Sequence, residues 1–92
     1  MIVGFRHKGL KRLFERDDAS AIRPDFADKV RTILNQLDEA RTIEDMRMTS
    51  FHLHPLKGEM KGFWSVTVRA NWRIVFRFGD GDADKVDLID YH

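Results

Sequence analysis

The spacing of apolar residues changes its period part-way along the chain, and this change restricts the fold more than any other feature. Residues 24–40 repeat apolar side chains at helical spacing, at Phe26, Val30, Ile33, Leu34 and Leu37. Residues 64–78 alternate apolar and polar side chains instead, as strands with one buried face do. Helical segments followed by a run of strands predict an α+β domain in which the helices cover one face of an antiparallel sheet.

A second amphipathic helix is expected before the longer one. Leu10, Leu13 and Phe14 form a single apolar stripe within residues 7–16, and most of the remaining surface of this segment is basic. Pro24 then suits the first turn of the longer helix, because its missing N–H would have no partner there. Both helices are therefore expected to pack on the sheet.

The other expected elements are short. They are a strand at residues 2–6, a helical turn at 43–48, a loop at 51–62, and strands at 64–69, 72–78 and from 83 onward. Ala70 and Asn71 suit a hairpin turn in which Asn71 tolerates a positive φ, and residues 79–82 are rich in glycine and aspartate. The last three strands are therefore predicted to form an antiparallel meander.

The length and composition restrict the protein to a few classes. A chain of 92 residues is one domain, residues 1–92, without room for a second core. It contains no cysteine, which excludes disulfides and thiolate chemistry and is typical of a reducing cytoplasm. Its apolar runs are too short for a transmembrane helix or a signal peptide. We therefore expect a cytoplasmic protein that does not interact with a membrane.

The net charge of +1 conceals blocks of alternating sign. Counting Lys, Arg, Asp and Glu, residues 1–16 carry +4, residues 17–50 carry −3, residues 51–77 carry +4 and residues 78–92 carry −4. If the two basic blocks converge in the fold, they would form a surface that binds phosphate. The alternative is that the charges are solvated faces without a ligand.

Two histidines and the end of the chain offer metal-binding groups. His52 and His54 would point the same way in an extended segment, and could share a metal with a further ligand such as Asp90 or His92. The alternative is two exposed histidines in a loop. If Asp90, Tyr91 and His92 continue the last strand, Asp90 and His92 share one face and Tyr91 lies on the other. The alternative for these residues is a frayed tail.

Further side chains could act on a phosphodiester. Arg73 and Arg77 are expected on the open face of the sheet, away from the helices, and His54 and Lys57 lie close together in a loop. With the terminal residues they supply a base, an acid, an oxyanion stabiliser and an aromatic ring. Metal-free ribonuclease chemistry requires such a set, because a 2′-hydroxyl loses a proton, a phosphorane is stabilised and a 5′-oxygen gains a proton.

Five short motifs carry a resemblance to a known family. They lie at residues 5–11, 54–58, 64–66, 70–74 and 90–92, and in this order they resemble the HigB branch of the RelE toxin superfamily. The resemblance implies a RelE-like, microbial ribonuclease-type fold. It also implies a toxin that cleaves mRNA in the ribosomal A site without a metal or a small-molecule cofactor, and a helix-turn-helix antitoxin of the HigA type as its partner.

The resemblance also implies roles for individual residues. His54 matches a catalytic histidine, Arg73 matches an arginine that steadies the scissile phosphate, and Asp90, Tyr91 and His92 complete the catalytic set. Lys57 matches a lysine near the path of the phosphates. We expect four further residues to contact RNA, namely Lys8, Lys11, Arg12 and Arg77.

Two other functions remain open from the sequence. The first is a non-catalytic module that binds RNA or a protein partner, because a fold does not fix a function. The second is a metal-dependent hydrolase that uses His52, His54 and a ligand near the end of the chain.

Overall fold

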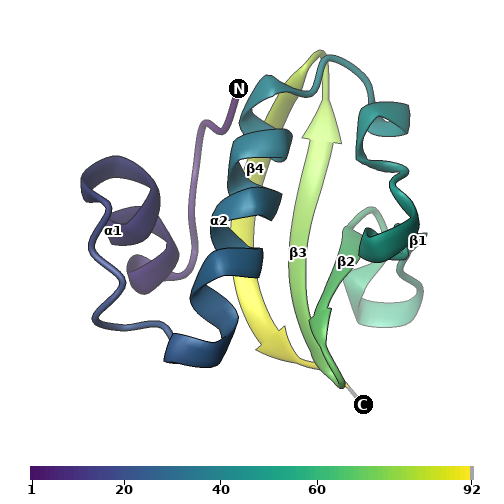
Figure 1. The fold of residues 1–92 in the computed structure, drawn as a ribbon. Helices are drawn as coiled ribbons and strands as arrows, with labels where there is room; N and C mark the ends of the chain where they lie inside the picture. The colour runs from purple at the N-terminus through teal and green to yellow at the C-terminus, as the bar shows by residue number, and fades with distance from the viewer. Residues whose placement is uncertain (92) are drawn as a thin grey trace.

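The computed structural model describes residues 1–91 and shows helices packed against a four-stranded antiparallel sheet, the predicted α+β class (Figure 1). The helices are α1 (Lys8–Arg16) and α2 (Pro24–Glu39). The strands lie side by side in the order β1 (His54–Pro55), β2 (Trp64–Arg69), β3 (Trp72–Gly79) and β4 (Asp82–Asp90). Three short 3₁₀ helices complete the chain, namely η1 (Ile43–Met46), η2 (Thr49–Phe51) and η3 (Gly58–Met60).

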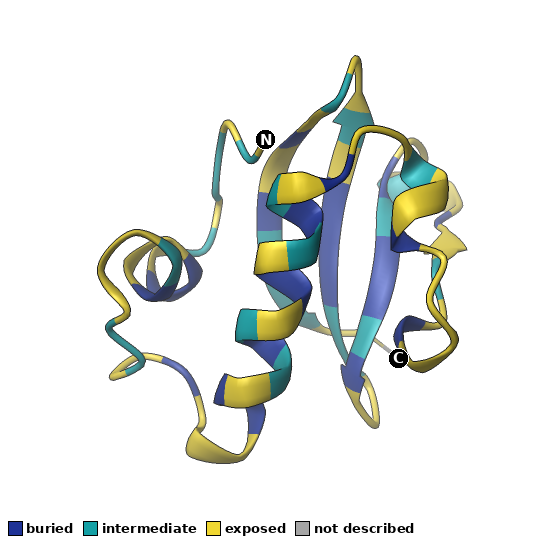
Figure 2. Cartoon of the chain, turned by 45° about the horizontal axis from the view of Figure 1, so that its top comes forward, coloured by how far each residue is buried: buried dark blue, intermediate teal, exposed yellow. Residues whose placement is uncertain are grey.

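The α2 helix lies lengthwise across one face of the sheet, as the sequence predicted (Figure 1). Figure 2 shows its buried residues as an inward stripe and its exposed residues on the outer side. The five apolar residues with helical spacing are all buried, and Leu34 is 1% exposed. They pack on a sheet face that includes Val66, Val68, Ile74, Phe76 and Val86. Within residues 1–91, no helix has the length and apolarity that crossing a bilayer requires.

The α1 helix lies beside α2 (Figure 1), and its two ends are capped in different ways. At its start, the Nδ1 atom of His7 accepts a hydrogen bond from the backbone N–H of Leu10, with a donor–acceptor distance of 3.1 Å. At its end, Asp17 adopts a left-handed conformation with φ 53°. Leu10 and Leu13 are buried in the main core, as expected.

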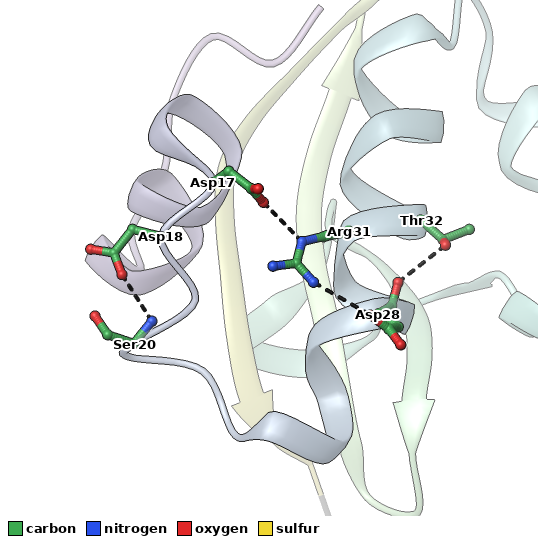
Figure 3. Close-up of polar contacts among 6 residues, drawn as sticks. All are labelled: Asp17, Asp18, Ser20, Asp28, Arg31 and Thr32. Carbon is green, nitrogen blue, oxygen red and sulfur yellow. Dashed lines mark hydrogen bonds and ion pairs between the residues drawn. The ribbon is translucent and has the colours of Figure 1, made fainter.

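Polar contacts hold the connection between the two helices (Figure 3). Arg31 of α2 donates from Nε to Asp17 at 3.0 Å and from Nη1 to Asp28 at 3.3 Å. The backbone N–H of Ser20 donates to the carboxylate of Asp18 at 3.0 Å, and this hydrogen bond lowers the pKa of Asp18. The carboxylates of Asp17 and Asp28 therefore neutralise the positive charge of Arg31.

The prediction of a strand at residues 2–6 is wrong. This segment runs beside β4 but makes only two isolated parallel bridges with it, which are Ile2–Ala83 and Phe5–Val86. At this point β4 contains an irregularity, because Lys85 adopts φ 53° and the register against β3 shifts. A continuous ladder does not form along a bulged edge.

Both predicted turns between the last three strands are confirmed. Ala70 and Asn71 connect β2 to β3, and Asp80 and Gly81 connect β3 to β4. In the second turn both residues have positive φ, as in a type I′ hairpin turn. In the first turn the positive φ, 51°, belongs to Ala70 and not to Asn71.

The prediction of a loop at residues 51–62 is wrong at His54 and Pro55. These two residues form β1 and pair with Ser65 and Trp64 of β2. A strand of two residues that includes a proline has no alternating pattern from which it could be predicted.

A second, smaller apolar cluster lies on the face of the sheet away from α2. It consists of Leu56, Phe63 and Val75, with Met60 and Ile89 packed against it. Val75 points away from its neighbours Ile74 and Phe76, which belong to the main core, because successive strand residues face opposite sides. The segment between β1 and β2 therefore folds over this face and leaves only part of it open.

Candidate active site

A groove of about 320 Å³ lies on the open face of the sheet, next to the second cluster. Its walls come from the segment before β2, from β2 and β3, and from the residue that follows β4. The lining residues are His52, His54, Leu56, Ser65, Thr67, Arg73 and Tyr91. Three of the five predicted catalytic residues, which are far apart in the sequence, therefore meet at one place.

The hairpin turn between β2 and β3 positions two of these residues. The guanidinium of Arg73 donates hydrogen bonds to the carbonyls of Ala70 and Trp72 and is half-buried. The backbone N–H of Tyr91 donates to the carbonyl of Asn71 at 2.8 Å. Adjacent carbonyls of one turn therefore hold an arginine from β3 and the end of β4 at the same groove.

The two histidines of the groove lie two residues apart, and the extended segment expected for both includes only His54. His54 lies in β1 opposite Ser65, and its side chain is exposed. His52 adopts a left-handed conformation with φ 50° where the chain passes from η2 to β1. Among residues 1–91, no three His, Asp or Glu side chains lie close enough together to hold a metal ion.

The sequence analysis missed two polar residues of the groove. Ser65, which is 3% exposed, and Thr67, which is half-buried, line it from β2. The alternation in β2 was visible in the sequence and put both residues on the face that carries Arg73. The missing information was that a groove lies on this face, which depends on how the preceding segment folds.

The structure places the other predicted catalytic residues differently. Asp90 pairs with Trp72, whose ring packs 5.8 Å from that of Phe26 in α2. Cross-strand partners share a face, so the side chain of Asp90 lies on the helix side, opposite to Ile89. His92 lies outside the described residues. Lys57 is exposed just before η3 and does not line the groove.

The four additional residues expected to contact RNA lie at two separate places. Lys8, Lys11 and Arg12 line a shallow depression on α1, together with Glu15 and Arg16. Arg77 lies on β3, with its guanidinium 5.1 Å from the centroid of the Phe63 ring. The structure therefore does not bring the α1 cations to the groove.

The groove combines three kinds of chemistry that act on a phosphodiester. An imidazole changes its charge near neutral pH, so it can take up or release a proton. A guanidinium fixed by backbone carbonyls is ready to stabilise the charge of a phosphorane without moving. The exposed phenol ring of Tyr91, which is 38% exposed, offers a surface for stacking of a base.

The architecture is shared with a solved structure. A solved structure, the YoeB/ParE toxin from Agrobacterium tumefaciens, superimposes on this chain with a TM-score of 0.59 at 18% identity. The alignment covers 99% of this chain and 96% of that one. At this level of identity the likeness shows a shared fold.

The family follows from the sequence comparison. The model of the HigB-like toxin family, described as the RelE-like toxin HigB of type II toxin–antitoxin systems, matches residues 3–92, and the chain belongs to this family. A curated relative, the endoribonuclease HigB of Proteus vulgaris, is 46% identical over 92 residues, which is the full length of both chains. The resemblance noted in the sequence is therefore confirmed, and membership of the family implies an antitoxin as a partner.

Proposed function

We propose that the protein is an endoribonuclease that cleaves mRNA in the ribosomal A site and so inhibits translation. The observation that carries this proposal is the meeting of His54, Arg73 and Tyr91 in one groove on the open face of the sheet. The name of the Proteus vulgaris relative, an endoribonuclease, supports the same activity. The mRNA bound to the ribosome is the substrate, and a helix-turn-helix antitoxin in the cytoplasm is the inhibitor.

The proposed reaction is an internal transfer of the phosphoryl group. The 2′-hydroxyl loses its proton and its oxygen attacks the adjacent phosphorus. The bond from phosphorus to the 5′-oxygen breaks, and that oxygen receives a proton. The products are a 2′,3′-cyclic phosphate, which water can open to a 3′-phosphate, and a free 5′-hydroxyl. Each step needs only proton transfer and charge stabilisation.

The residues of the site divide this work. His54 gives a proton to the leaving 5′-oxygen, and His92 handles the proton of the 2′-hydroxyl. Asp90 has no direct part in this proposal, because its side chain lies on the helix side of the sheet. Arg73 stabilises the charge of the phosphorane, because its guanidinium is held by two carbonyls beside the groove. Lys57 neutralises a neighbouring phosphate, and Tyr91 stacks on a base.

The dependence on the ribosome is tested by comparing two forms of one mRNA. The purified protein is incubated with the mRNA alone and with the same mRNA in a translating ribosome. We expect cleavage of the ribosome-bound form and little cleavage of the naked form. Equal rates on both would remove the ribosome from the proposal and leave a general ribonuclease.

An enzyme is distinguished from a binding module by a variant that keeps binding. We expect His92→Ala to lose toxicity on induction while it still associates with ribosomes. Unchanged toxicity would exclude His92 from the reaction. A metal-dependent hydrolase is tested by cleavage in excess chelator, and full activity there would eliminate that alternative.

A further inference from the structure

Two guanidinium groups contact one aromatic ring on the open side of the sheet. The Cζ atoms of Arg6 and Arg77 lie 5.2 Å and 5.1 Å from the centroid of the Phe63 ring. The ring is buried at 5% exposure, whereas both arginines are exposed. We call Arg6, Phe63 and Arg77 the Phe63 stack.

The local backbone fixes the ring in this position. Gly62 adopts φ +93°, a conformation that favours glycine, and a Cβ there would lie 3.5 Å from Nη2 of Arg77. The carbonyl of Phe63 accepts a hydrogen bond from the N–H of Leu56 at 2.9 Å. The ring also packs on Val75 in the second cluster. It is therefore a rigid platform, and its attraction for each cation offsets part of their mutual repulsion.

Neither cation of the stack forms an ion pair with a carboxylate within residues 1–91, although Arg77 lines a hollow that also includes Asp82 and Asp84. Asp84 is the register partner of Arg77, but its carboxylate accepts a hydrogen bond from the N–H of Lys85 at 2.7 Å instead. Each guanidinium therefore keeps donors that an anion can bind, and both contact the same ring.

The stack and the groove belong to one continuous surface. Leu56 lines the groove and also packs with Phe63, so it is a wall that the two places share. Arg73 and Arg77 lie on the same face of β3, four residues apart, which corresponds to about 13 Å along a strand. This span exceeds the distance between neighbouring phosphates of one strand.

We propose that the Phe63 stack binds a phosphodiester of the RNA strand that occupies the groove, at least one nucleotide beyond the scissile phosphate. This inference rests on the proposed function, because it takes the occupant of the groove to be RNA. It assigns a binding role to Arg6 and a supporting role to Phe63. The depression on α1 fits less well as the path of the strand, because none of its lining residues lines the groove or belongs to the second cluster.

The test measures the binding of single-stranded RNA that cannot be cleaved. Fluorescent 2′-O-methyl oligonucleotides of three and twelve nucleotides are titrated with the full chain at several salt concentrations. Where binding of the trinucleotide is too weak to titrate directly, it is measured by competition with the long oligonucleotide. The variants are Arg6→Gln and Arg77→Gln. Arg41→Gln is the matched control, because it removes the same charge from an exposed residue outside both surfaces. Melting curves establish that each variant is folded.

We expect each stack variant to bind the long oligonucleotide about fivefold more weakly at low salt, as for loss of one exposed ion pair. The slope of log K against log salt should fall by about 0.7 for each lost phosphate contact. Binding of the trinucleotide should stay within twofold of the wild type, and the Arg41→Gln protein should bind both oligonucleotides as the wild type does.

Two outcomes would overturn the inference alone. The first is that the stack variants bind the long RNA no more weakly than the control. The second is that they weaken both oligonucleotides by the same factor. If the wild-type protein binds neither RNA at low salt, the inference about the stack fails, whereas the proposed function is decided by the cleavage of ribosome-bound mRNA. Phe63→Leu adds a check on the platform, since it fills the cluster but removes the ring, and it should weaken binding of the long RNA only.

Discussion

The two faces of the sheet differ in how much apolar surface they bury and in whether their arginines have carboxylate partners. On the side of α2, residues such as Ile74 and Phe76 are fully buried. Four arginines around that side have carboxylate partners, namely Arg23, Arg31, Arg47 and Arg69. On the open side the apolar cluster is small, and Arg73 and Arg77 have no carboxylate partner within residues 1–91.

This difference separates stability from function in a chain of only 92 residues. The buried side supplies most of the apolar burial that stabilises the fold. The open side holds arginines that form no ion pair with a carboxylate within residues 1–91, so a ligand with negative charge gains the most binding free energy there. Substitutions on the buried side should therefore change stability, and substitutions on the open side should change activity. Each of the following experiments could contradict that separation.

The largest effect is expected in the centre of α2. Leu34→Ala removes a side chain that is 1% exposed, and should lower the free energy of unfolding by about 2–5 kcal/mol. Urea unfolding measures this loss, and cleavage per folded molecule should stay at the wild-type level. Asn35→Ala is the control, because this neighbour is exposed and should change stability by less than about 0.5 kcal/mol. A folded Leu34→Ala protein without activity would contradict the separation.

The next largest effect is expected on the open side, in rate. Arg73→Ala should slow mRNA cleavage by about 10²–10³-fold, because it removes one preorganised charge from the transition state. Its melting temperature should stay close to that of the wild type. The guanidinium bonds to the carbonyl of Ala70 in an exposed turn and to that of the half-buried Trp72, and Arg73 belongs to neither apolar cluster. Arg41→Ala is the control in both assays. If Arg73→Ala unfolds the protein, Arg73 is a structural residue and its catalytic role is wrong.

The buried side was predictable from the sequence because its signals are periodic. The residues of α2 repeat every three or four positions and those of β2 and β3 every second position, and both patterns come from the shape of the backbone itself. The turns were predictable because Asp80–Gly81 has the residues that a positive φ requires. The positive φ of Ala70 was not predictable in this way, because alanine is not a residue type that indicates a positive φ.

The open side was less predictable because long-range contacts determine it. Val75 lies on the open face between two residues of the main core, Ile74 and Phe76, and the fold of the segment before β2 covers it. The place where His54, Arg73 and Tyr91 meet depends on the pairing of three strands, which no local pattern specifies. The likeness to a family, and not the spacing of these residues, indicated that they form one site.

An intermediate effect on stability is expected at Val75, in the second cluster. Val75→Ala removes the equivalent of two buried methylene groups from the second cluster and should cost about 1.5 kcal/mol. The loss of stability should be confined to the segment before β2, because the second cluster joins this segment to the sheet. Hydrogen exchange of the Leu56 amide, which donates to the Phe63 carbonyl, should accelerate. The amide of Val66, within the main core, should exchange as slowly as before.

Equal acceleration at both amides would contradict that interpretation of the Val75→Ala protein. It would mean that the second cluster unfolds together with the main core, and that the two sides of the sheet form one cooperative unit.

The smallest effect is expected in the response to acid, at a carboxylate that follows α2. Asp45 accepts hydrogen bonds from the backbone N–H groups of Arg41 and Thr42, and these bonds lower its pKa below the usual value of 3.8. A lowered pKa stabilises the fold above pH 3.8, and this contribution is lost as the pH falls through the folded-state value. Asp45→Asn should therefore melt at a slightly lower temperature at pH 7. Its melting temperature should also fall less steeply than that of the wild type below pH 4. Arg77→Gln, which removes a cation on the open side, should leave the fall of the melting temperature below pH 4 unchanged. If the melting temperature of the Asp45→Asn protein falls below pH 4 as steeply as that of the wild type, these two hydrogen bonds do not contribute to the stability of the fold.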